Sequence, residues 1–358
     1  MFKIVDRYII KKFLQTFFFM LGVIMLLATV FDLAEKFSEF IENNATISDV
    51  VFDYYVNFVL FYGNMFSSMI IFVSVIWFTA KMAQNTEIIP IWNSGRSFGR
   101  FVRPYMVAAT ILMLISLALN HFIIPRSNKV RLEFEEKYYR RTMYVQNYYA
   151  EFPGNKVVYF STYNAQTNLI EDFNVQQWNE KGDLVRSIRA RNAENEKGTP
   201  KWVLHDYYER VVGFPNDRII EGQEKDTTFE FDIGEMATRE NVAEAMTYFE
   251  LKEFIERERA KGNPMVPNYE VELYQRTSYP FATYVLTIIG IAVASRKRRG
   301  GVGASIAFGL MVVFVYIFAM KVTTVAAMNV GLHAMYAVWI PNLLFAGVAY
   351  MMYRKAKT

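Results

Sequence analysis

Few residue types in this 358-residue chain could carry out chemistry by themselves. There is no cysteine, which excludes disulfides, thiolate metal sites and cysteine nucleophiles. The three histidines, His121, His205 and His333, lie far apart in sequence, so a histidine-built metal or catalytic centre is not expected. The chain has no P-loop, no HExxH and no nucleophile elbow. We therefore predict no catalytic residue, metal or cofactor, and the net charge of +4 is too small to indicate a nucleic-acid partner.

One segment, residues 85–100, has a composition that is unusual for a free loop. It is too short to cross a membrane, yet apolar side chains stand between its charged ones. The residues of interest are Glu87, Ile88, Ile91, Trp92, Gly95 and Arg96. A short amphipathic helix that rests in the groove of a partner protein would bury the apolar positions. The alternative is a helix on the membrane surface whose arginines face lipid phosphates.

Two further charges lie near the far ends of long apolar runs. Asp32 follows Phe13 by ~19 residues, or about 28 Å of helix, and Lys321 follows Val302 by a similar length. Charges at such a depth are costly in a bilayer, so they usually face a cavity or a partner. We predict that both lie near one headgroup layer, that Lys321 contacts anionic groups of the lipid, and that Asp32 is its resting partner within this chain or in a second subunit. Snorkelling of Lys321 to the interface is the alternative.

Six apolar runs must position these residues, and each approaches the ~20 residues that a membrane-spanning helix needs. They cover residues 13–31, 58–80, 105–124, 280–294 (starting from 274 if extended), 302–325 and 335–353. Six runs of near-spanning length favour transmembrane helices over buried core helices. The first run is too long for a signal peptide and no cleavage site follows it, so we expect it to be retained.

Basic residues orient the six spans. They are Lys3, Arg7, Lys11 and Lys12 before the first span, Lys81, Arg96, Arg100 and Arg103 between the second and third, the run 296–299 between the fourth and fifth, and Arg354, Lys355 and Lys357 after the sixth. All of them fall on one side when the spans alternate, and that side is the cytoplasm. Both termini are therefore expected inside, and the block between the third and fourth spans outside.

This outer block has the pattern of a β-domain. Short β-prone runs at 157–160, 173–175, 184–190, 202–204 and 229–233 are separated by turn signals. A β-sandwich or open barrel is predicted, with an apolar interior that includes Phe160, Phe173, Val175, Trp202, Phe229 and Phe231. The predicted fold is an α-helical integral membrane protein with six transmembrane helices and an inserted all-β, jellyroll-like domain. Its parts are residues 1–125, 126–270 and 271–358.

At three places the chain resembles the LptF/LptG family of lipopolysaccharide export permeases. DRYI, from Asp6 to Ile9, resembles the family's entry to its first helix, and that of LptG more than that of LptF. EIIPIWNSGRS, from Glu87 to Ser97, resembles the cytoplasmic coupling segment, and YQRTSYP, from Tyr274 to Pro280, resembles the R-x-x-x-P approach to the fourth helix. The order of three helices, β-domain and three helices is similar as well, so the resemblance covers essentially the whole chain.

The resemblance implies the permease subunit of an ABC transporter that extracts lipopolysaccharide from the bacterial inner membrane, with no ATPase site of its own. The implied partners are an LptB-like ATPase dimer, a paralogous LptF/LptG subunit, and LptC- and LptA-like periplasmic proteins that receive the lipid. Glu87 then anchors an arginine of the ATPase through charge-assisted hydrogen bonds, and Gly95 ends the coupling helix. The implied lipid contacts are Asp32, Lys36, Lys321, Phe173 and Phe229.

The chain departs from the family pattern at two positions. Pro90 interrupts the coupling segment, and Asp32 stands where LptG-like members often carry a lysine. A different class of function also fits six spans and an outer domain, namely a membrane-embedded regulator or receptor that senses a ligand or controls a periplasmic enzyme. A secondary transporter fits less well, because such proteins usually show paired halves with broken helices.

Overall fold

The computed structural model describes residues 4–138, 144–152, 154–164, 168–195, 199–229, 242–263, 265–295 and 301–357. The chain divides into two compact units. The helical unit comprises residues 1–134, 244–249 and 267–358, and the β unit comprises residues 135–243 and 250–266. The basic run 296–299 and residues 230–233 of the last predicted strand, Phe231 among them, lie outside the described residues.

Six helical stretches are long and apolar enough to cross a membrane, which confirms the predicted six-span fold. They are α1 (Ile4–Glu42), α3 (Ser67–Gln84), α5 (Phe98–Ala118) with η2 (Leu119–Ile123) and α6 (Ile124–Tyr138), α10 (Val266–Ala294), α11 (Gly301–Asn329) and α12 (Ala334–Lys357). The shorter helical elements are η1 (Asp49–Tyr55), α2 (Val56–Met65), α4 (Ile88–Asn93), α8 (Val242–Ala245) and α9 (Tyr248–Ala260). Both η1 and η2 are π-helical turns.

The helices depart from the predicted spans mainly at their ends. α1 continues beyond residues 13–31 on both sides, because its polar flanks carry no stop signal until Asn44, which takes a left-handed φ of 54°. The second predicted span is interrupted at Phe66, between α2 and α3. The charged stretch after residue 124 continues the third span as α6.

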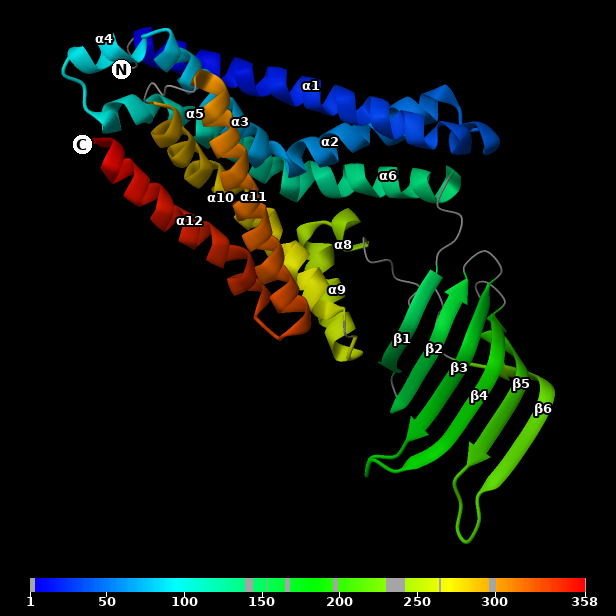
Figure 1. The fold of residues 1–358 in the computed structure, drawn as a ribbon. Helices are drawn as coiled ribbons and strands as arrows, with labels where there is room; N and C mark the ends of the chain where they lie inside the picture. Colours follow the sequence, from blue (N-terminus) through cyan, green and yellow to red (C-terminus); the bar gives the residue numbers. More distant parts are fainter. Residues whose placement is uncertain are drawn as a thin grey trace. The chain divides into compact units, whose positions relative to one another are not determined.

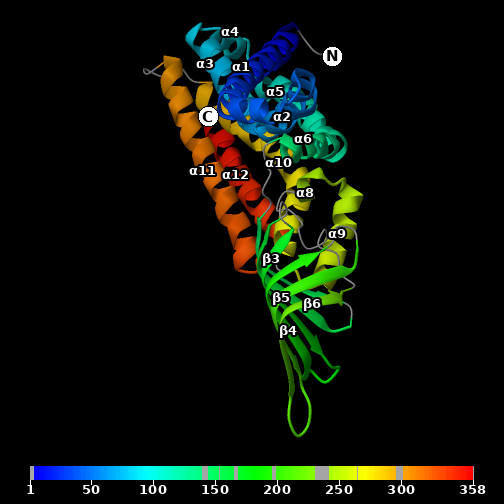
Figure 2. The ribbon, with the colours of Figure 1, turned by 90° about the vertical axis from the view of Figure 1, so that its right-hand side faces the viewer.

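The most buried spanning helix is α3. One of its faces joins α1 and α5 in an apolar cluster that includes Phe13, Val75 and Tyr105. Its other face joins α10, α11 and α12 in a second cluster, and α11 and α12 run side by side (Figures 1 and 2). α11 packs closely at Gly309, where an added Cβ would stand 2.3 Å from Ile76 Cδ1. Such small residues allow helix backbones to approach each other within a bilayer.

A polar joint, formed by Asn64, Ser116, Asn120 and Arg276, links α2, α5, η2 and α10. Pro280 has no N–H, so the carbonyl of Arg276 cannot receive its usual helical hydrogen bond. The Asn120 amide donates to that carbonyl at 3.2 Å and accepts from the Asn64 amide at 2.7 Å. Ser116 Oγ donates to Asn64 Oδ1 at 2.8 Å. The joint therefore satisfies a backbone group that the proline leaves open inside an apolar bundle.

The β unit contains one six-stranded antiparallel sheet whose strands lie in the order of the sequence (Figure 1). The strands are β1 (Tyr144–Phe152), β2 (Lys156–Asn164), β3 (Leu169–Trp178), β4 (Leu184–Asn195), β5 (Lys201–Val211) and β6 (Arg218–Thr228). This confirms an all-β insertion between helices, and the connectivity of the described strands is that of a meander. Four of the predicted runs lie in β2–β5, whereas β1 and the polar β6 were not predicted.

One face of the sheet carries the apolar core. Phe160, Phe173 and Trp202 are each 1% exposed or less, and the Phe173 and Trp202 rings stack with centroids 5.2 Å apart. Phe229 follows β6 and packs at the edge of this cluster as a partly buried side chain. The predicted inward positions within the described residues therefore belong to one core, with Phe229 at its border.

A charged cluster continues the inner face of the sheet beyond this apolar core. Glu209 on β5 is 3% exposed and accepts from Arg186 of β4 at 2.6 Å and from Lys225 of β6. Burial opposes ionisation of the Glu209 carboxyl, but the hydrogen bonds from Lys225 and Arg186 outweigh it and lower its pKa below the ordinary value. The ion pairs thus join three neighbouring strands.

We expect the β unit to lose stability as the pH falls through the acidic range. The lowered pKa of Glu209 means that its contribution is fully present above the ordinary glutamate pKa and disappears as the pH falls through the folded value. Glu209→Gln should lower the free energy of unfolding by about 1–3 kcal/mol at pH 7 and flatten its dependence on acid pH. Urea unfolding followed by tryptophan fluorescence at pH 7 and pH 4 measures both effects. Glu221→Gln, on exposed β6, is the matched control, and equal pH dependence in the two variants would contradict the prediction.

Candidate functional site

The segment of residues 85–100 contains the short helix α4, and its sequence explains where that helix starts and stops. Pro90 lies in the first turn of α4, where a backbone N–H has no helical acceptor, so the proline is compatible with the helix. Gly95 follows the helix with a φ of 73°, and its N–H donates to the Trp92 carbonyl at 2.9 Å. A glycine takes this left-handed conformation without strain.

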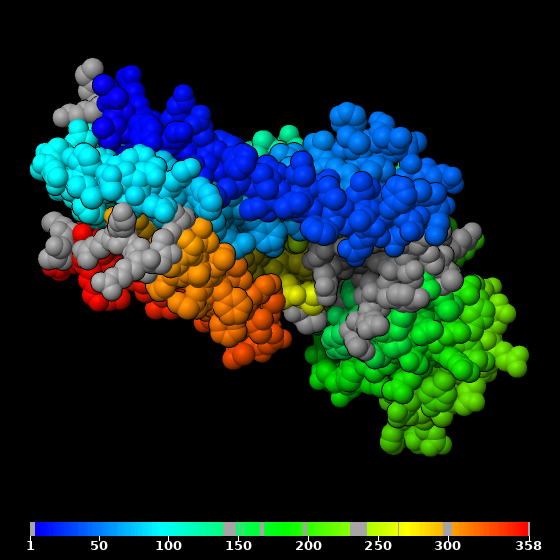
Figure 3. Space-filling view, turned by 45° about the horizontal axis from the view of Figure 1, so that its top comes forward, coloured from blue at the N-terminus to red at the C-terminus, as the bar shows by residue number. Residues whose placement is uncertain are grey.

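The apolar residues of the segment divide between two environments. Ile88 is 2% exposed and belongs to the core formed by α1, α3 and α5, with Ile91 packed against it. Ile89 is 48% exposed and Trp92 is 36% exposed. Figure 3 shows the segment around α4 (cyan) at the surface, beside the start of α1 (dark blue). Ile88 therefore fixes the orientation of α4 from inside, while Ile89 and Trp92 form the face that a partner can reach.

Glu87 directly precedes α4 and already has partners within the chain. Its carboxylate accepts from the Tyr8 hydroxyl at 3.1 Å and from the Asn85 amide at 3.1 Å. The side chain is half-buried, so both oxygens keep room for a further donor. Tyr8, part of the DRYI motif, was not predicted to touch this segment. Arg96 lies beyond the turn at Gly95 and is also half-buried.

The far end of the segment is held by an ion pair. Arg100 Nη2 donates to Asp6 Oδ2 at 2.5 Å, and the Asp6 side chain is buried. Ser97 caps α5 by accepting from the Arg100 N–H at 3.3 Å. The residue pattern indicated Arg100 only as a topology signal or a lipid-phosphate contact, whereas in the structure its guanidinium binds the first turn of α1.

The other end of α1 carries a second polar cluster, which we call the outer cluster: Asp32, Lys36, Tyr54 and Tyr55. Lys36 Nζ lies 2.6 Å from Asp32 Oδ1 and also donates to the Tyr54 hydroxyl. Both tyrosine hydroxyls lie 3.3 Å from the Asp32 carboxylate. The π-helical turn η1 presents two successive tyrosines to Asp32, an arrangement that residue spacing did not reveal.

Among the described residues of this chain, Asp32 forms an ion pair with Lys36 rather than with Lys321. Lys321 lies on an exposed face of α11 and forms no ion pair with any described residue. The i, i+4 spacing of Asp32 and Lys36 on one helix explains their pairing. Whether Lys321 meets an acidic group of a second subunit stays a prediction.

The two aromatic side chains predicted to contact lipid differ in accessibility. Phe173 is 1% exposed beneath its neighbours, whereas Phe229 is partly buried at the border of the same core. Their ring centroids are 5.7 Å apart. Phe229 can meet a ligand from the rim, and Phe173 can do so only if the sheet opens.

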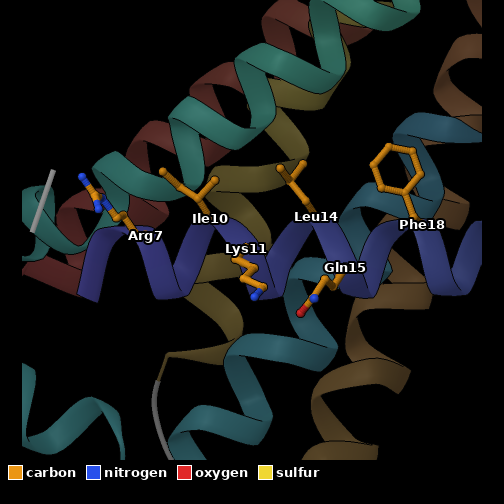
Figure 4. Close-up of a pocket in the computed structure, with 6 residues that line it drawn as sticks. All are labelled: Arg7, Ile10, Lys11, Leu14, Gln15 and Phe18. Atoms are coloured by element: carbon orange, nitrogen blue, oxygen red, sulfur yellow. The ribbon is translucent and has the colours of Figure 1, made fainter. Parts of the chain in front are cut away.

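A shallow hollow lies along the first half of α1. It is lined by Arg7, Ile10, Lys11, Leu14, Gln15 and Phe18. In Figure 4, Ile10, Leu14 and Phe18 extend to one side of the helix, while Lys11 and Gln15 extend to the other. All six lining residues belong to α1, so the hollow is an open surface along one helix rather than an enclosed site.

Among the described residues, no group of histidine, aspartate and glutamate side chains could hold a metal ion. A family model described as lipopolysaccharide export system permease LptF/LptG matches residues 7–355, which is nearly the whole chain. The match includes the segment of residues 85–100 and the outer cluster. It covers LptF and LptG together, so the preference for LptG stays a prediction. No curated protein matches the chain.

Proposed function

The chain belongs to the family of lipopolysaccharide export permeases LptF/LptG, and we propose that it is the membrane subunit of an ABC transporter that extracts lipopolysaccharide from the inner membrane and passes it to a periplasmic bridge. The family match over residues 7–355 carries this proposal. The proposed partners are an LptB-like ATPase dimer, a paralogous permease subunit, and LptC- and LptA-like proteins. In this proposal both termini and α4 face the cytoplasm, and the β unit faces the periplasm.

The exposed face of α4 supports docking of the ATPase. Ile89 and Trp92 offer an apolar surface, and Glu87 stands beside it with a carboxylate that can accept from an arginine of the ATPase. Because Ile88 is packed in the core of the helical unit, a push on α4 reaches α1, α3 and α5 directly. This gives ATP hydrolysis by the partner a route into the membrane helices.

The surface of α1 supports contact with lipid and with a second subunit. Only 11% of the apolar 18-residue stretch of α1 is buried within this chain, whereas 67% of the corresponding stretch of α3 is buried. An apolar helix with so little cover must meet acyl chains or another protein. Asp32 and Lys36 of the outer cluster lie on this helix, where Lys36 can exchange Asp32 for a lipid phosphate.

The proposed function is tested by purifying the tagged chain from bacterial membranes and identifying the proteins and lipid that accompany it. The isolated complex is then placed in liposomes with lipopolysaccharide, ATP and a soluble periplasmic acceptor, with a photo-crosslinker at Phe229. An accompanying ATPase, ATP-dependent transfer of lipid and crosslinks to lipid at Phe229 are expected. A stable complex without an ATPase or lipid transfer would indicate a regulator or receptor. Transfer without crosslinks would remove the β unit from the lipid path.

Lys321→Ala is expected to reduce the stimulation of ATPase activity by lipopolysaccharide several-fold, because it removes one charge-assisted contact with the lipid. Lys321→Arg should retain most of the stimulation, because the positive charge is kept. Lys252→Ala, at an exposed lysine of α9, is the control. Wild-type stimulation in both Lys321 variants would leave only snorkelling as the role of this lysine.

A further inference from the structure

Both ends of the proposed coupling segment are tied to the same turn of α1. Glu87, just before α4, accepts from the Tyr8 hydroxyl at 3.1 Å, and Arg100, at the start of α5, donates to Asp6 at 2.5 Å. Asp6 and Tyr8 lie two residues apart in the first turns of α1. We propose that Asp6 and Tyr8 form a brace that positions the coupling segment and links its movement to α1. This inference rests on the proposed function.

The Asp6–Arg100 pair is the fixed half of the brace. Asp6 is 2% exposed, so its carboxylate has exchanged water for the guanidinium. A buried carboxylate that loses its partner is strongly destabilised, which makes this contact difficult to break. Ser97 caps the same turn of α5, so Arg100 is held from both sides. The start of α5 therefore moves together with the start of α1.

The Tyr8–Glu87 contact is the adjustable half. Tyr8 is 40% exposed, and its hydroxyl makes one hydrogen bond of ordinary length with Glu87. A single exposed hydrogen bond contributes little net free energy, so it can be made and broken during a cycle. Together with the hydrogen bond from the Asn85 amide, it orients the Glu87 carboxylate. An arginine that binds Glu87 therefore meets an acceptor whose direction depends in part on α1.

Continuity of α1 gives the brace a consequence for transport. The helix runs without interruption from Ile4 to Glu42, and Tyr8 stands 24 residues before Asp32, or about 36 Å along its axis. The same rigid element thus carries the brace at one end and the outer cluster at the other. Asp6 and Tyr8 act through Glu87 and Arg100, so we assign them as positioning residues. Their loss should lower the amount of lipid moved per ATP more than it lowers binding of the ATPase.

Tyr8→Phe tests the adjustable half in the intact complex, because it removes only the hydroxyl. We expect the ATPase to co-purify normally. The amount of lipopolysaccharide transferred per ATP hydrolysed should fall about threefold, which corresponds to the free energy of a weak hydrogen bond. In a double-mutant cycle, Tyr8→Phe should add no further loss to Glu87→Ala, because alanine leaves no acceptor for the Tyr8 hydroxyl. Tyr350→Phe, at an exposed tyrosine of α12, is the control. Wild-type transfer per ATP in Tyr8→Phe, or fully additive losses in the cycle, would overturn the adjustable half.

Charge exchange tests the fixed half. Asp6→Arg and Arg100→Asp alone should each lower transfer per ATP about tenfold or more, because each leaves like charges facing each other in a buried site. The double variant restores opposite charges and should regain transfer to a large extent. Where a single variant fails to fold, the conservative Asp6→Asn in the folded complex should still lower transfer per ATP. The brace would be overturned if the double variant did not regain transfer and Asp6→Asn left transfer per ATP unchanged. Absence of an ATPase from the wild-type complex would instead overturn the proposed function.

Discussion

A Glu87→Arg variant is expected to lose the ATPase during purification and to stop exporting lipopolysaccharide. Glu87 stands beside the exposed apolar face of α4, where docking would remove its carboxylate from water. Removing one partner of a desolvated charge pair costs about 2–5 kcal/mol, and an arginine at this position also repels the arginine of the ATPase. Association should therefore weaken by at least about thirtyfold at the lower limit of that range.

Folding of the membrane domain should survive this substitution. Among the described residues, the Glu87 side chain accepts hydrogen bonds from Tyr8 and Asn85, and both lie at the exposed surface. Surface contacts of this kind contribute little to stability. Co-purification of the ATPase and lipid transfer are measured beside the thermal midpoint of the permease. Glu253→Arg, at an exposed glutamate of α9, is the control. Wild-type yield of the ATPase together with lipid export would show that α4 is not the coupling site.

The second large effect is expected in the polar joint. Asn120→Leu removes the donor that satisfies the Arg276 carbonyl, which Pro280 has already deprived of its helical partner. It also leaves the Asn64 amide without its 2.7 Å acceptor. Each buried polar group left unpaired costs about 1–3 kcal/mol. We therefore expect a marked fall in the thermal midpoint of the permease in detergent.

Pro280→Ala provides the decisive comparison. The alanine supplies an N–H that can donate to the Arg276 carbonyl, so adding it to Asn120→Leu should recover a large part of the lost stability. Asn329→Leu, at an exposed asparagine near the end of α11, is the matched control for the loss of an amide. An Asn120→Leu protein with unchanged stability, or a double variant no more stable than the single one, would contradict the role given to Asn120.

The β unit shows where patterns of residues lead to strands and where they do not. The runs that contain Phe160, Phe173 and Trp202 are rich in β-branched and aromatic residues, and they form strands whose inward side chains share one core. The strand β6 reads RIIEGQEKDTT and is mostly polar, so its sequence does not indicate a strand. It forms because β5 pairs with it along most of its length, from Lys201 to Val211. Hydrogen bonding to a neighbour, rather than side-chain burial, specifies this edge strand.

The sequence by itself determined the class of the protein. Apolar runs near the span of a bilayer, with basic residues on alternating loops, specify six transmembrane helices, because the cost of burying polar groups in lipid acts on the chain locally. The segment around Glu87 was evident for a similar reason, since a short apolar stretch between charges is unfavourable in water unless a partner or a membrane surface covers it. These signals need no knowledge of how the helices pack.

Only the tertiary structure decided which side chains meet. Tyr8 and Glu87 are separated by 79 residues, and Asp6 and Arg100 by 94, so no local period joins them. The same is true of Asp32, which pairs with Lys36 on its own helix and gains Tyr54 and Tyr55 through the π-helical turn η1 rather than meeting Lys321. Long-range pairs depend on the orientation of each helix about its axis. Packing of side chains such as Phe13, Ile88 and Tyr105 sets that orientation, and it emerges only when the whole core is assembled.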